Sequence, residues 1–322
     1  MQKEKQKLLL ITGPTAAGKT DLALSIARDF AGEILCADSM QIYRDMHIGT
    51  ARPLPEEQAG IPHHLFGEIA PDAPYSVAAY QQEAQRRMQD IWARDKLPIA
   101  VGGTGLYIHA LLYQVDFTDA APDDALREQL SQQYDAPGGA DRLYIELLKK
   151  DPAAAARIHK NDKKRLIRRL EILQNEAAQE PYAFRRPQEH YDTLVLGVNK
   201  DRAQLYRDIN LRVDQMMAQG LCREAEAVYR AYGANIPAFL AIGYKEFLPY
   251  FAGEATLAEV TEKIKQNTRH FAKRQLTWFR REPQIKWFFA EEYADRAQEL
   301  SAMEREIAAF LHGEEVGEDR LD

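Results

Sequence analysis

Apolar and polar positions follow two different periods along the chain, one typical of buried strands and one of amphipathic helices. Short apolar runs of strand length are found at 7–12, 32–37, 97–101 and 192–198. They are continuous rather than alternating, which is typical of strands buried on both faces of a parallel sheet. Apolar residues that recur every three or four positions predict helices that end near 29 and span 76–95, 201–219, 222–232 and 257–279. Strands that alternate with helices predict an α/β fold with a parallel sheet.

Two stretches break this alternation. Residues 50–75 are rich in proline, glycine and histidine and predict a long loop. His63 and His64 lie in it without a third ligand nearby in sequence, so we expect hydrogen-bonded or solvated side chains there rather than a metal site. From 115 to 195 strand signals are absent and helical patterns follow one another. The helices predicted in that stretch span 123–133, 141–150, 153–159 and 162–175.

We therefore predict a core that is interrupted by an all-helical insertion. The first part of the core spans 1–114, the insertion 115–195, and the second part of the core 196–312. Residues 286–289 are a candidate for a last, short edge strand. The tail at 313–322 is acidic, and we expect it to be frayed.

Composition narrows the class of protein. The 322 residues are 45% hydrophobic and 28% charged, which is typical of a soluble globular protein with a sizeable core. No apolar run approaches the roughly 18 residues of a membrane span, and the chain runs directly into a strand without a signal peptide, so we expect a cytoplasmic protein. Cys36 and Cys222 exclude a disulfide framework and a zinc knuckle, and we expect both to be reduced core thiols.

The clearest chemical signal is the octapeptide between the first strand and the first helix. It reads Gly13, Pro14, Thr15, Ala16, Ala17, Gly18, Lys19 and Thr20, a P-loop in its required context. The glycines let backbone N–H groups and the helix N-terminus converge on one anion, while the lysine adds a positive charge and the threonine a hydroxyl for Mg²⁺. The sequence therefore predicts a site for a diphosphate or triphosphate.

Two further polar segments follow strands at the same edge of the predicted sheet. One starts at Asp38, after the strand at 32–37, and the other is a glycine-rich turn that contains Thr104, after the strand at 97–101. Because ligands of open α/β sheets bind at the carboxyl ends of strands, we expect Asp38 beside the P-loop and Thr104 as a hydroxyl of the site. A plain strand-to-helix turn is the alternative for Thr104.

Basic residues are concentrated in two segments of a chain whose net charge is −7. Residues 157–169 carry seven lysines and arginines against one acid, Asp162, and residues 263–281 carry seven with no acid. This pattern predicts two surfaces that meet a polyanion, and two ordinary solvated helix faces are the alternative. The inward stripe of the long helix also contains Thr268 and Gln275, which we expect to line a polar cavity, to bind the P-loop side of the core, or to pair within the core.

Six motifs, in this order, closely resemble those of bacterial tRNA dimethylallyltransferases, also called tRNA isopentenyltransferases. They are the P-loop at 13–20, Asp-Ser-Met-Gln-Ile-Tyr at 38–43, Gly-Gly-Thr-Gly-Leu-Tyr at 102–107, Asn-Asp-x-x-Arg-x-x-Arg-x-Leu-Glu at 161–171, Ile-Gly-Tyr-Lys-Glu at 242–246, and Lys-Arg-Gln-Leu-Thr-Trp-Phe-Arg at 273–280. The likeness covers the chain from Leu8 to about Trp287.

The resemblance implies a P-loop-kinase-like core with a helical insertion that contacts the tRNA anticodon stem-loop. It implies transfer of a dimethylallyl group from dimethylallyl diphosphate to the N6 amine of the adenosine 3′ to the anticodon, tRNA position 37. Asp38 would be the general base, with Thr104 beside it, and the P-loop would hold the diphosphate, with Mg²⁺ on Thr20. We expect a monomer without a membrane partner.

The resemblance and the two basic segments together also assign a set of residues to tRNA. They are Asp38, Ser39, Met40, Gln41, Thr104, Arg127, Asp162, Lys163, Lys164, Arg165, Leu166, Lys273, Arg274 and Arg280. One position departs from the family pattern. Many members have an arginine directed to the diphosphate where this chain has Glu226, so either Arg223 or another basic residue replaces it, or the diphosphate binds more weakly.

The chemistry of the implied reaction suits these residues. The lone pair of an adenine amine is delocalised into the ring, so the amine needs a carboxylate that takes its proton as the new bond forms, and Asp38 can supply it. The growing charge of the leaving diphosphate is best met by preorganised N–H groups, Lys19 and Mg²⁺.

Two other functions share parts of this pattern. A P-loop nucleoside or small-molecule kinase would have the same core, but it would not need the two basic segments. A nucleotide-switched RNA-binding module would need no general base, so Asp38→Ala would leave its function intact. Incubation with labelled dimethylallyl diphosphate and tRNA, against ATP as the other donor, separates the transferase from the kinase.

Overall fold

The computed structural model describes residues 5–114, 123–174 and 186–314 of the chain. It divides into two compact units, one formed by Met1–Leu112 with Gln188–Asp322 and the other by Tyr113–Pro187. Each unit has its own hydrophobic core, and each is described separately below.

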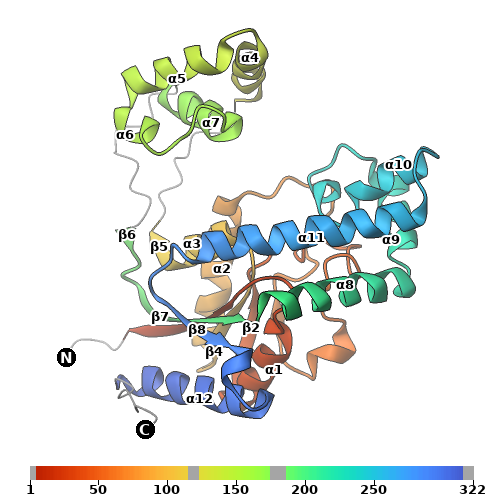
Figure 1. The fold of residues 1–322 in the computed structure, drawn as a ribbon. Helices are drawn as coiled ribbons and strands as arrows, with labels where there is room; N and C mark the ends of the chain where they lie inside the picture. The colour runs from red at the N-terminus through yellow and green to blue at the C-terminus, as the bar shows by residue number, and fades with distance from the viewer. Residues whose placement is uncertain (1–4, 115–122, 175–185, 315–322) are drawn as a thin grey trace. The chain divides into compact units, whose positions relative to one another are not determined.

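The main unit is built on a parallel sheet, as the sequence predicts, and this sheet has six strands (Figure 1). Its strands, in spatial order, are β3 (His63–His64), β2 (Gly32–Cys36), β4 (Leu97–Gly102), β1 (Gln6–Thr12), β7 (Tyr191–Asn199) and β8 (Ile285–Phe289). All neighbouring strands pair in parallel. β1 lies near the middle of the sheet, and its residues Leu8 to Ile11 are completely buried, which explains its continuous apolar run.

Helices cover both faces of this sheet. On one face, α1 (Lys19–Asp29) and α12 (Arg296–His312) pack against the side chains of β1, β2, β4 and β7 that point toward them. The alternate residues of the strands point to the other face, where α2 (Val77–Trp92) contacts β2 and β4 and packs on α3 (Gly105–Leu112). The layered arrangement places the carboxyl ends of the strands beside the starts of α1 and α3.

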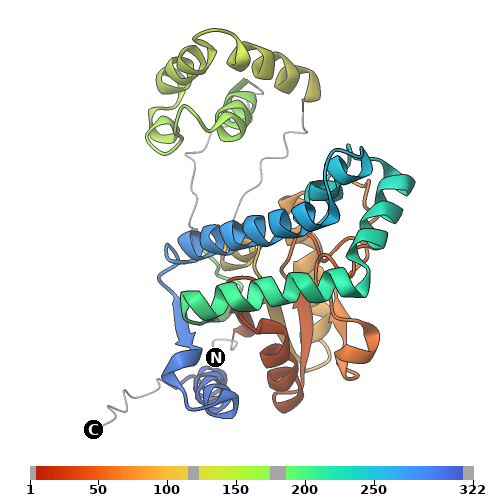
Figure 2. The ribbon, with the colours of Figure 1, turned by 45° about the vertical axis from the view of Figure 1, so that its right-hand side comes forward.

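A further helical layer follows β7. It contains α8 (Arg202–Gln219), α9 (Leu221–Tyr232), the short α10 (Leu248–Phe251) and α11 (Leu257–Phe279). α8 and α11 lie side by side in both views (Figures 1 and 2). α11 starts where the sequence predicts, because Thr256 and Glu259 form a reciprocal capping box at its first turn. Single 3₁₀ turns span Pro55–Gln58, Ala238–Leu240, Lys245–Phe247 and Ala290–Glu292.

The second unit is helical, as predicted. It contains α4 (Asp124–Asp135), α5 (Gly139–Lys150), the short α6 (Pro152–Ala155) and α7 (Lys163–Gln174), around a core of leucines, alanines and isoleucines. A two-stranded antiparallel pair, β5 (Tyr113–Gln114) with β6 (Arg186–Pro187), closes the unit where the chain enters and leaves it.

The sequence-based end of the insertion needs correction. Residue 195 lies inside β7, which pairs with β1 along seven residues of the main sheet. The compact helical unit ends at Pro187, because β7 pairs with β1 from Tyr191 to Gly197 and with β8 from Val195 to Asn199, so it belongs to the sheet along its whole length. The tail expected at 313–322 is described only to Glu314, with Gly313 as the cap of α12, and the rest lies outside the described residues.

The elements of the main unit that are missing from the sequence-based prediction include a helix and a strand. The first is α12, and the second is β3, which lies inside the stretch predicted to be a loop. β3 is an edge strand of two residues held by pairing with β2, in the register Ile34 with His63. A strand this short owes its existence to the neighbouring sheet and leaves no periodic pattern of its own.

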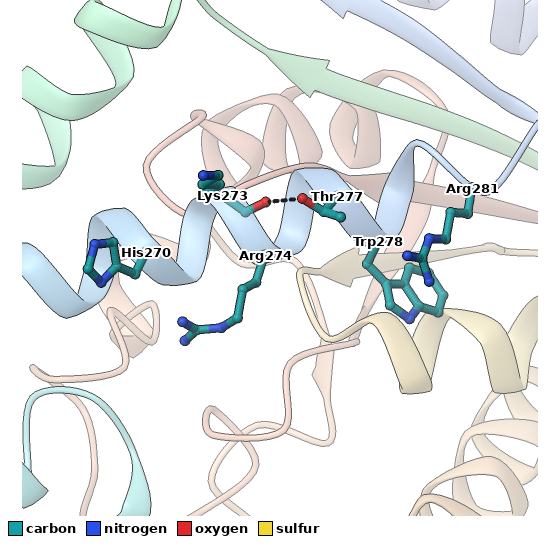
Figure 3. Close-up of a pocket in the computed structure, with 6 residues that line it drawn as sticks. All are labelled: His270, Lys273, Arg274, Thr277, Trp278 and Arg281. Atoms are coloured by element: carbon teal, nitrogen blue, oxygen red, sulfur yellow. Dashed lines mark hydrogen bonds between the residues drawn. The ribbon is translucent and has the colours of Figure 1, made fainter. Parts of the chain in front are cut away.

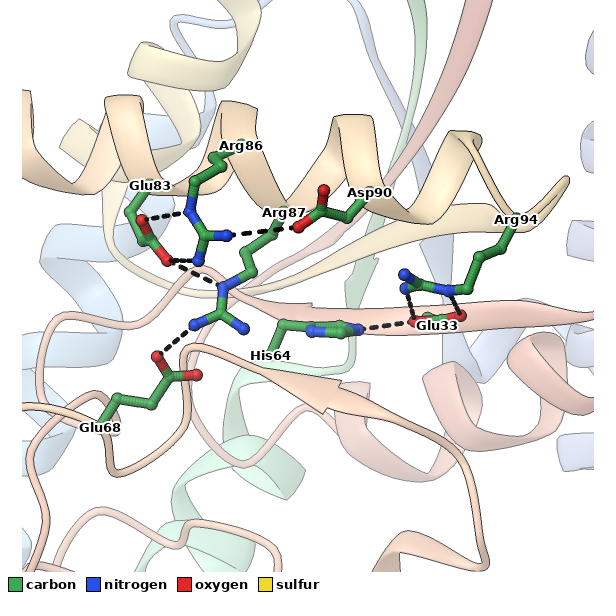
Figure 4. A network of polar contacts seen from close by, with 8 residues as sticks. All are labelled: Glu33, His64, Glu68, Glu83, Arg86, Arg87, Asp90 and Arg94. Atoms are coloured by element: carbon green, nitrogen blue, oxygen red, sulfur yellow. Dashed lines mark hydrogen bonds and ion pairs between the residues drawn. The ribbon is translucent and has the colours of Figure 1, made fainter.

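A network of charged side chains lies beside this edge of the sheet (Figure 4). The buried carboxylate of Glu33 lies 2.7 Å from Nε2 of His64 and accepts a 2.7 Å hydrogen bond from Arg94. Burial would raise the pKa of Glu33, but Arg94 and His64 outweigh it and lower that pKa. Nδ1 of His63 lies 2.8 Å from the carbonyl oxygen of Ile61. Each histidine thus has a ring nitrogen within hydrogen-bond distance of a protein oxygen, as the sequence analysis expects of hydrogen-bonded side chains.

Candidate functional site at the carboxyl edge of the sheet

The P-loop occupies the turn between β1 and α1. Gly18 is the N-cap of α1 with φ of 89°, in the left-handed region that glycine adopts without strain, and it makes no side-chain cap. The N–H groups of the first helical turn therefore have no side-chain acceptor from the N-cap residue, and the positive end of the helix dipole adds to them. This is the geometry that binds a phosphate or diphosphate.

Gln275 of α11 joins the P-loop to the second glycine-rich turn. Its Oε1 accepts a 2.9 Å hydrogen bond from the backbone N–H of Thr15, and its Nε2 donates a 2.9 Å bond to the carbonyl of Gly103. The side chain is 5% exposed, and a Cβ on Gly103 would lie 2.2 Å from Nε2, so only glycine fits there. This confirms the prediction that a polar residue on the inward stripe of α11 binds the P-loop side of the core.

Lys19 is the charged centre of the loop. Its Nζ donates hydrogen bonds to the carbonyls of Gly13 at 3.0 Å and Pro14 at 2.7 Å. Burial and the nearby positive charge of Arg212 lower the pKa of Lys19 to about 7, against an opposing effect of Asp38. An anion in the loop would compensate exactly the two effects that disfavour the protonated amine.

Arg212 is a site residue that the sequence interpretation missed. It lies on α8, immediately before the buried Val213, and its half-buried side chain places a positive charge near Lys19. An arginine next to the inward stripe of a helix is the one sequence signal that could have identified it. Glu226, which stands where the family pattern has an arginine, forms a 2.6 Å ion pair with Arg230 on its own helix. Arg212 is one basic residue whose charge acts on the P-loop lysine, and Arg296 donates a 2.6 Å hydrogen bond to the carbonyl of Gly18 in the same loop.

Asp38 follows β2, and its charge interacts with that of Lys19 in the P-loop. Its Oδ1 accepts a 2.9 Å hydrogen bond from the N–H of Met40. Burial raises the pKa of Asp38, while the Met40 N–H and the charge of Lys19 oppose the rise. A carboxylate whose pKa is raised in this way is a better proton acceptor than an ordinary aspartate.

Thr104 is tied to the segment that carries Asp38. Its Oγ1 accepts a 2.9 Å hydrogen bond from the N–H of Ser39 and donates a 3.2 Å bond to the Ser39 hydroxyl. The backbone N–H of Thr104 donates to the carbonyl of Ala37 at 3.2 Å. The structure thus brings together the two polar segments that the sequence places after separate strands.

Gln41 lies in the same segment, but its side chain is held by residues 50 and 51 rather than by the turn that contains Thr104. Its Nε2 donates to the carbonyls of Thr50 at 2.9 Å and Ala51 at 3.1 Å. Ser39, Met40 and Gln41 are all half-buried, as side chains that line a pocket would be.

A basic hollow of about 420 Å³ lies on α11 (Figure 3). Its lining residues are His270, Lys273, Arg274, Thr277, Trp278 and Arg281. Lys273 and Arg274 are exposed, as is Arg280 at the end of the helix. Trp278 is half-buried, and a Cβ on Gly105 would lie 2.5 Å from its ring, so the indole packs directly on the backbone of α3. The hollow combines cations with an aromatic ring, which is a combination that binds nucleic acid.

The basic residues of the helical unit are more neutralised than their sequence suggests. Acids from other parts of the same unit pair with three of them, Lys160 with Asp141, Lys163 with Asp135 and Arg169 with Asp151, and Arg168 pairs with Glu171 on its own helix. Lys164 and Arg165 are exposed, and Arg165 lies 3.5 Å from Asp162. The count of one acid against seven basic residues holds within residues 157–169, but acids outside that segment neutralise part of this charge in the folded unit.

Two residues that the sequence assigns to tRNA make contacts within this unit, one in its core and one at its partly exposed surface. Leu166 is completely buried in its core, so its side chain offers no surface to RNA. Arg127 donates a 2.9 Å hydrogen bond from Nε to the buried carboxylate of Glu171, and its side chain remains 38% exposed. Helical spacing explains why Leu166 is buried, because Leu166, Leu170 and Glu171 share the inward face of α7.

The described residues contain no group of three or more His, Cys, Asp or Glu side chains that could hold a metal ion. Among the same residues, no helix is long and apolar enough to cross a bilayer. Cys36 and Cys222 are both free thiols, the first buried and the second half-buried.

Family models and individual relatives that match this chain carry closely related descriptions. A family model described as IPP transferase matches residues 41–282, and one described as isopentenyl transferase matches 6–64. A tRNA dimethylallyltransferase of Geobacillus thermodenitrificans is 44% identical over 302 residues, which cover 92% of this chain and 95% of that protein. One of Geobacter sulfurreducens is 45% identical over 289 residues, which cover 88% and 92%.

Solved structures show the same relationship. The crystal structure of the full-length tRNA isopentenylpyrophosphate transferase of Bacillus halodurans is 39% identical, with a TM-score of 0.73 over 96% of this chain and 98% of that one. A eukaryotic dimethylallyltransferase captured acting on tRNA is 28% identical, with a TM-score of 0.82 over 98% of this chain and 82% of that one.

Proposed function

This chain belongs to the tRNA dimethylallyltransferase family, and from that premise we propose that it transfers a dimethylallyl group from dimethylallyl diphosphate to tRNA. The acceptor is the N6 amine of the adenosine 3′ to the anticodon, tRNA position 37. The observation that carries the proposal is the pairing of an anion-binding loop after β1 with a half-buried carboxylate after β2: Gln275 links the loop to Gly103, and the adjacent Thr104 is hydrogen-bonded to Ser39, next to Asp38.

The P-loop side binds the diphosphate. Backbone N–H groups at the start of α1, the Lys19 amine and the nearby Arg212 guanidinium stabilise the negative charge that grows on the diphosphate as the carbon–oxygen bond breaks. The Gln275 bridge fixes the P-loop backbone at Thr15 before the reaction, so little reorganisation of the loop is needed in the transition state.

Mg²⁺ fits this site through Thr20. Thr20 is the second residue of α1 and its side chain is exposed, so its hydroxyl is available to a cation that binds the diphosphate. Mg²⁺ commonly takes one or two protein oxygens, and completes its shell with phosphate oxygens and water, so no carboxylate cluster is required. When bound, it would neutralise part of the leaving-group charge.

Asp38 acts on the acceptor side as the general base. The N6 nitrogen forms a bond to C1 of the dimethylallyl group, the bond from C1 to the diphosphate oxygen breaks, and the N6 proton passes to the Asp38 carboxylate. Thr104, Ser39, Met40 and Gln41 form the polar wall against which an extruded adenine is held. Thr104 is part of this wall and is also hydrogen-bonded to Ser39, the residue next to Asp38.

The tRNA is held by basic side chains of both units. In the main unit these are Lys273, Arg274 and Arg280, and in the helical unit Arg127 and the exposed Lys164 and Arg165 beside Asp162 and Lys163. The proposal includes a monomeric enzyme that works in the cytoplasm, where its tRNA substrate is found.

The test uses purified protein, unmodified tRNA and two labelled donors, dimethylallyl diphosphate and ATP. We expect the prenyl label to enter the tRNA and no phosphate transfer from ATP. Asp38→Asn should lower kcat by roughly 10²- to 10⁴-fold, the range that general-base catalysis supplies, with tRNA still bound.

Asp45→Asn is the matched control, because it makes the same chemical change at an exposed position of the same segment. It should transfer at the wild-type rate. Phosphate transfer from ATP without prenyl transfer would support the kinase instead, and full activity of Asp38→Asn would remove this residue from its role.

A further inference from the structure

Glu224 of α9 accepts four hydrogen bonds from two other parts of the chain. Its Oε2 accepts from the backbone N–H groups of His47 and Ile48, both at 2.9 Å. Its Oε1 accepts from the N–H of Gly49 at 3.0 Å and from the hydroxyl of Tyr244 at 2.6 Å. One carboxylate thus satisfies three consecutive backbone donors of a segment that has no helix or strand of its own.

These bonds fix a segment that leads to the acceptor side of the site. The next two carbonyls along the chain, those of Thr50 and Ala51, accept the hydrogen bonds of the Gln41 side chain. Arg52 then donates to the carbonyl of Tyr43 at 2.7 Å and closes the segment on itself. A shift of the 47–49 backbone would therefore be passed to Gln41 through contiguous hydrogen bonds.

Tyr244 supports this arrangement from the other side. Its ring is completely buried, and a Cβ on Gly49 would lie 2.5 Å from it, so the backbone of the segment packs directly on the phenol ring. Burial and the charge of Glu224 raise the pKa of Tyr244, so the hydroxyl keeps its proton and can donate the hydrogen bond to Glu224.

The same short motif is braced against α11. Glu246 accepts a 2.9 Å bond from the N–H of Gly243 and a 2.7 Å bond from Nδ2 of Asn267, which lies on α11 two turns before Gln275. This gives the Ile242–Glu246 motif a physical role, which the mechanism described above does not use. α11 thereby holds the P-loop through Gln275 and the acceptor segment through Asn267, Tyr244 and Glu224.

We propose that Glu224, with Tyr244, is a positioning residue for the acceptor adenine: it holds residues 47–51 so that Gln41 faces the base. The inference rests on the proposed function. Glu224 touches neither substrate in this scheme, and it acts only through the segment it anchors. Charge-assisted bonds to three N–H groups make it a firmer anchor than neutral side chains would be.

Glu224→Gln is the test variant, measured for kcat, for tRNA binding and for affinity toward inorganic diphosphate. The amide has the same shape, but its NH₂ group would face backbone donors, so at most one oxygen remains to accept. We expect kcat to fall by roughly 10- to 100-fold, because displacements of about 1 Å in a positioned substrate have effects of this size. Diphosphate affinity should stay within about twofold of the wild type, since the P-loop is held separately by Gln275.

Glu226→Gln is the matched control two residues away on the same helix. It makes the same chemical change in a partly exposed pair with Arg230 and should leave kcat unchanged. Tyr244→Phe is a second variant that removes one donor, keeps the buried ring, and should lower kcat by a smaller factor.

A double-variant cycle separates positioning from plain stabilisation of the fold. If Glu224 acts through Gln41, Glu224→Gln should have little further effect in a Gln41→Ala background. Assays are run well below the unfolding temperature of each variant. Wild-type kcat in Glu224→Gln and Tyr244→Phe, or a loss that is fully additive with Gln41→Ala, would overturn the positioning role and leave the proposed function intact. A wild-type protein that transfers no prenyl group would instead overturn both.

Discussion

At the scale of single residues, the site is organised by a conflict of charge around Lys19. Its amine is buried, lies near Arg212, and is compensated by Asp38 and by two carbonyls of its own loop. Without a ligand, the Lys19 amine therefore holds its proton weakly. A bound diphosphate adds negative charge beside the amine and stabilises its protonated form. Diphosphate binding should therefore be coupled to proton uptake.

This coupling predicts how affinity depends on pH. The pKa of Lys19 is about 7 in the free protein, and the anion raises it, so binding above pH 7 takes up a proton. The ratio of diphosphate affinities, wild type over Lys19→Met, should therefore fall as pH rises from 7, by up to about tenfold per unit. Calorimetric titration between pH 6 and 9 measures it, and the ratio cancels the ionisation of the ligand itself. A constant ratio would mean that Lys19 does not titrate in this range.

At the scale of elements, α11 performs two tasks on two of its faces. Its inward face carries Gln275 and Asn267, which hold the P-loop and the acceptor segment. Its outward face carries the cations Lys273 and Arg274 around the hollow of Figure 3. Because the two sets of side chains point in different directions, changes on the outward face should affect RNA binding without disturbing the diphosphate site.

Charge reversal of Lys273 and Arg274 to glutamate tests this separation. We expect weaker tRNA binding, with the slope of log affinity against log salt reduced by about 1.5, because two phosphate contacts are lost. Diphosphate affinity should not change. Fluorescence anisotropy across a salt series measures the slope.

A double reversal of Lys96 and Arg305 serves as the control for this experiment. Both residues are exposed; Lys96 precedes β4 at the amino edge of the sheet, and Arg305 lies on α12. The control changes net charge by the same amount and should keep the wild-type slope. Equal slopes for the two double variants would show that α11 does not contact the RNA backbone.

At the scale of the whole molecule, the chain is divided so that one unit can be removed without cutting the sheet. The N–H of Gln188 donates to the carbonyl of Leu112 at 3.3 Å, so the two ends of the main unit are already adjacent. The helical unit has its own buried core, and the sheet takes none of its strands from it.

Deletion of residues 113–187, closed by a short Gly-Ser linker, should therefore give a folded main unit. We expect diphosphate affinity close to that of the full chain, since the P-loop, Gln275, Lys19 and Arg212 all remain. Affinity for tRNA should fall by at least tenfold, because the cations of the helical unit are lost. Calorimetry with diphosphate and anisotropy with tRNA check the two halves of the prediction. Loss of diphosphate binding in a folded deletion variant would show that the units depend on each other.

Features that depend on neighbouring residues could be predicted from the sequence. The parallel strands follow from continuous apolar runs, α11 from its helical periodicity, and the P-loop from a motif whose geometry is local. The short strand β3 and the anions that pair with the basic residues of the helical unit could not be predicted in this way. They exist only through partners from other parts of the sheet or from other helices.

The sequence by itself determined the α/β core, the anion-binding loop and the carboxylate that follows the second strand, because each is encoded within a few consecutive residues. Only the tertiary structure decided that Arg212 lies near Lys19, that Gln275 bridges two loops, that Leu166 is buried, and that Glu224 anchors a segment about 175 residues away. The physical reason is that such contacts depend on how helices pack and strands register, which no local pattern specifies.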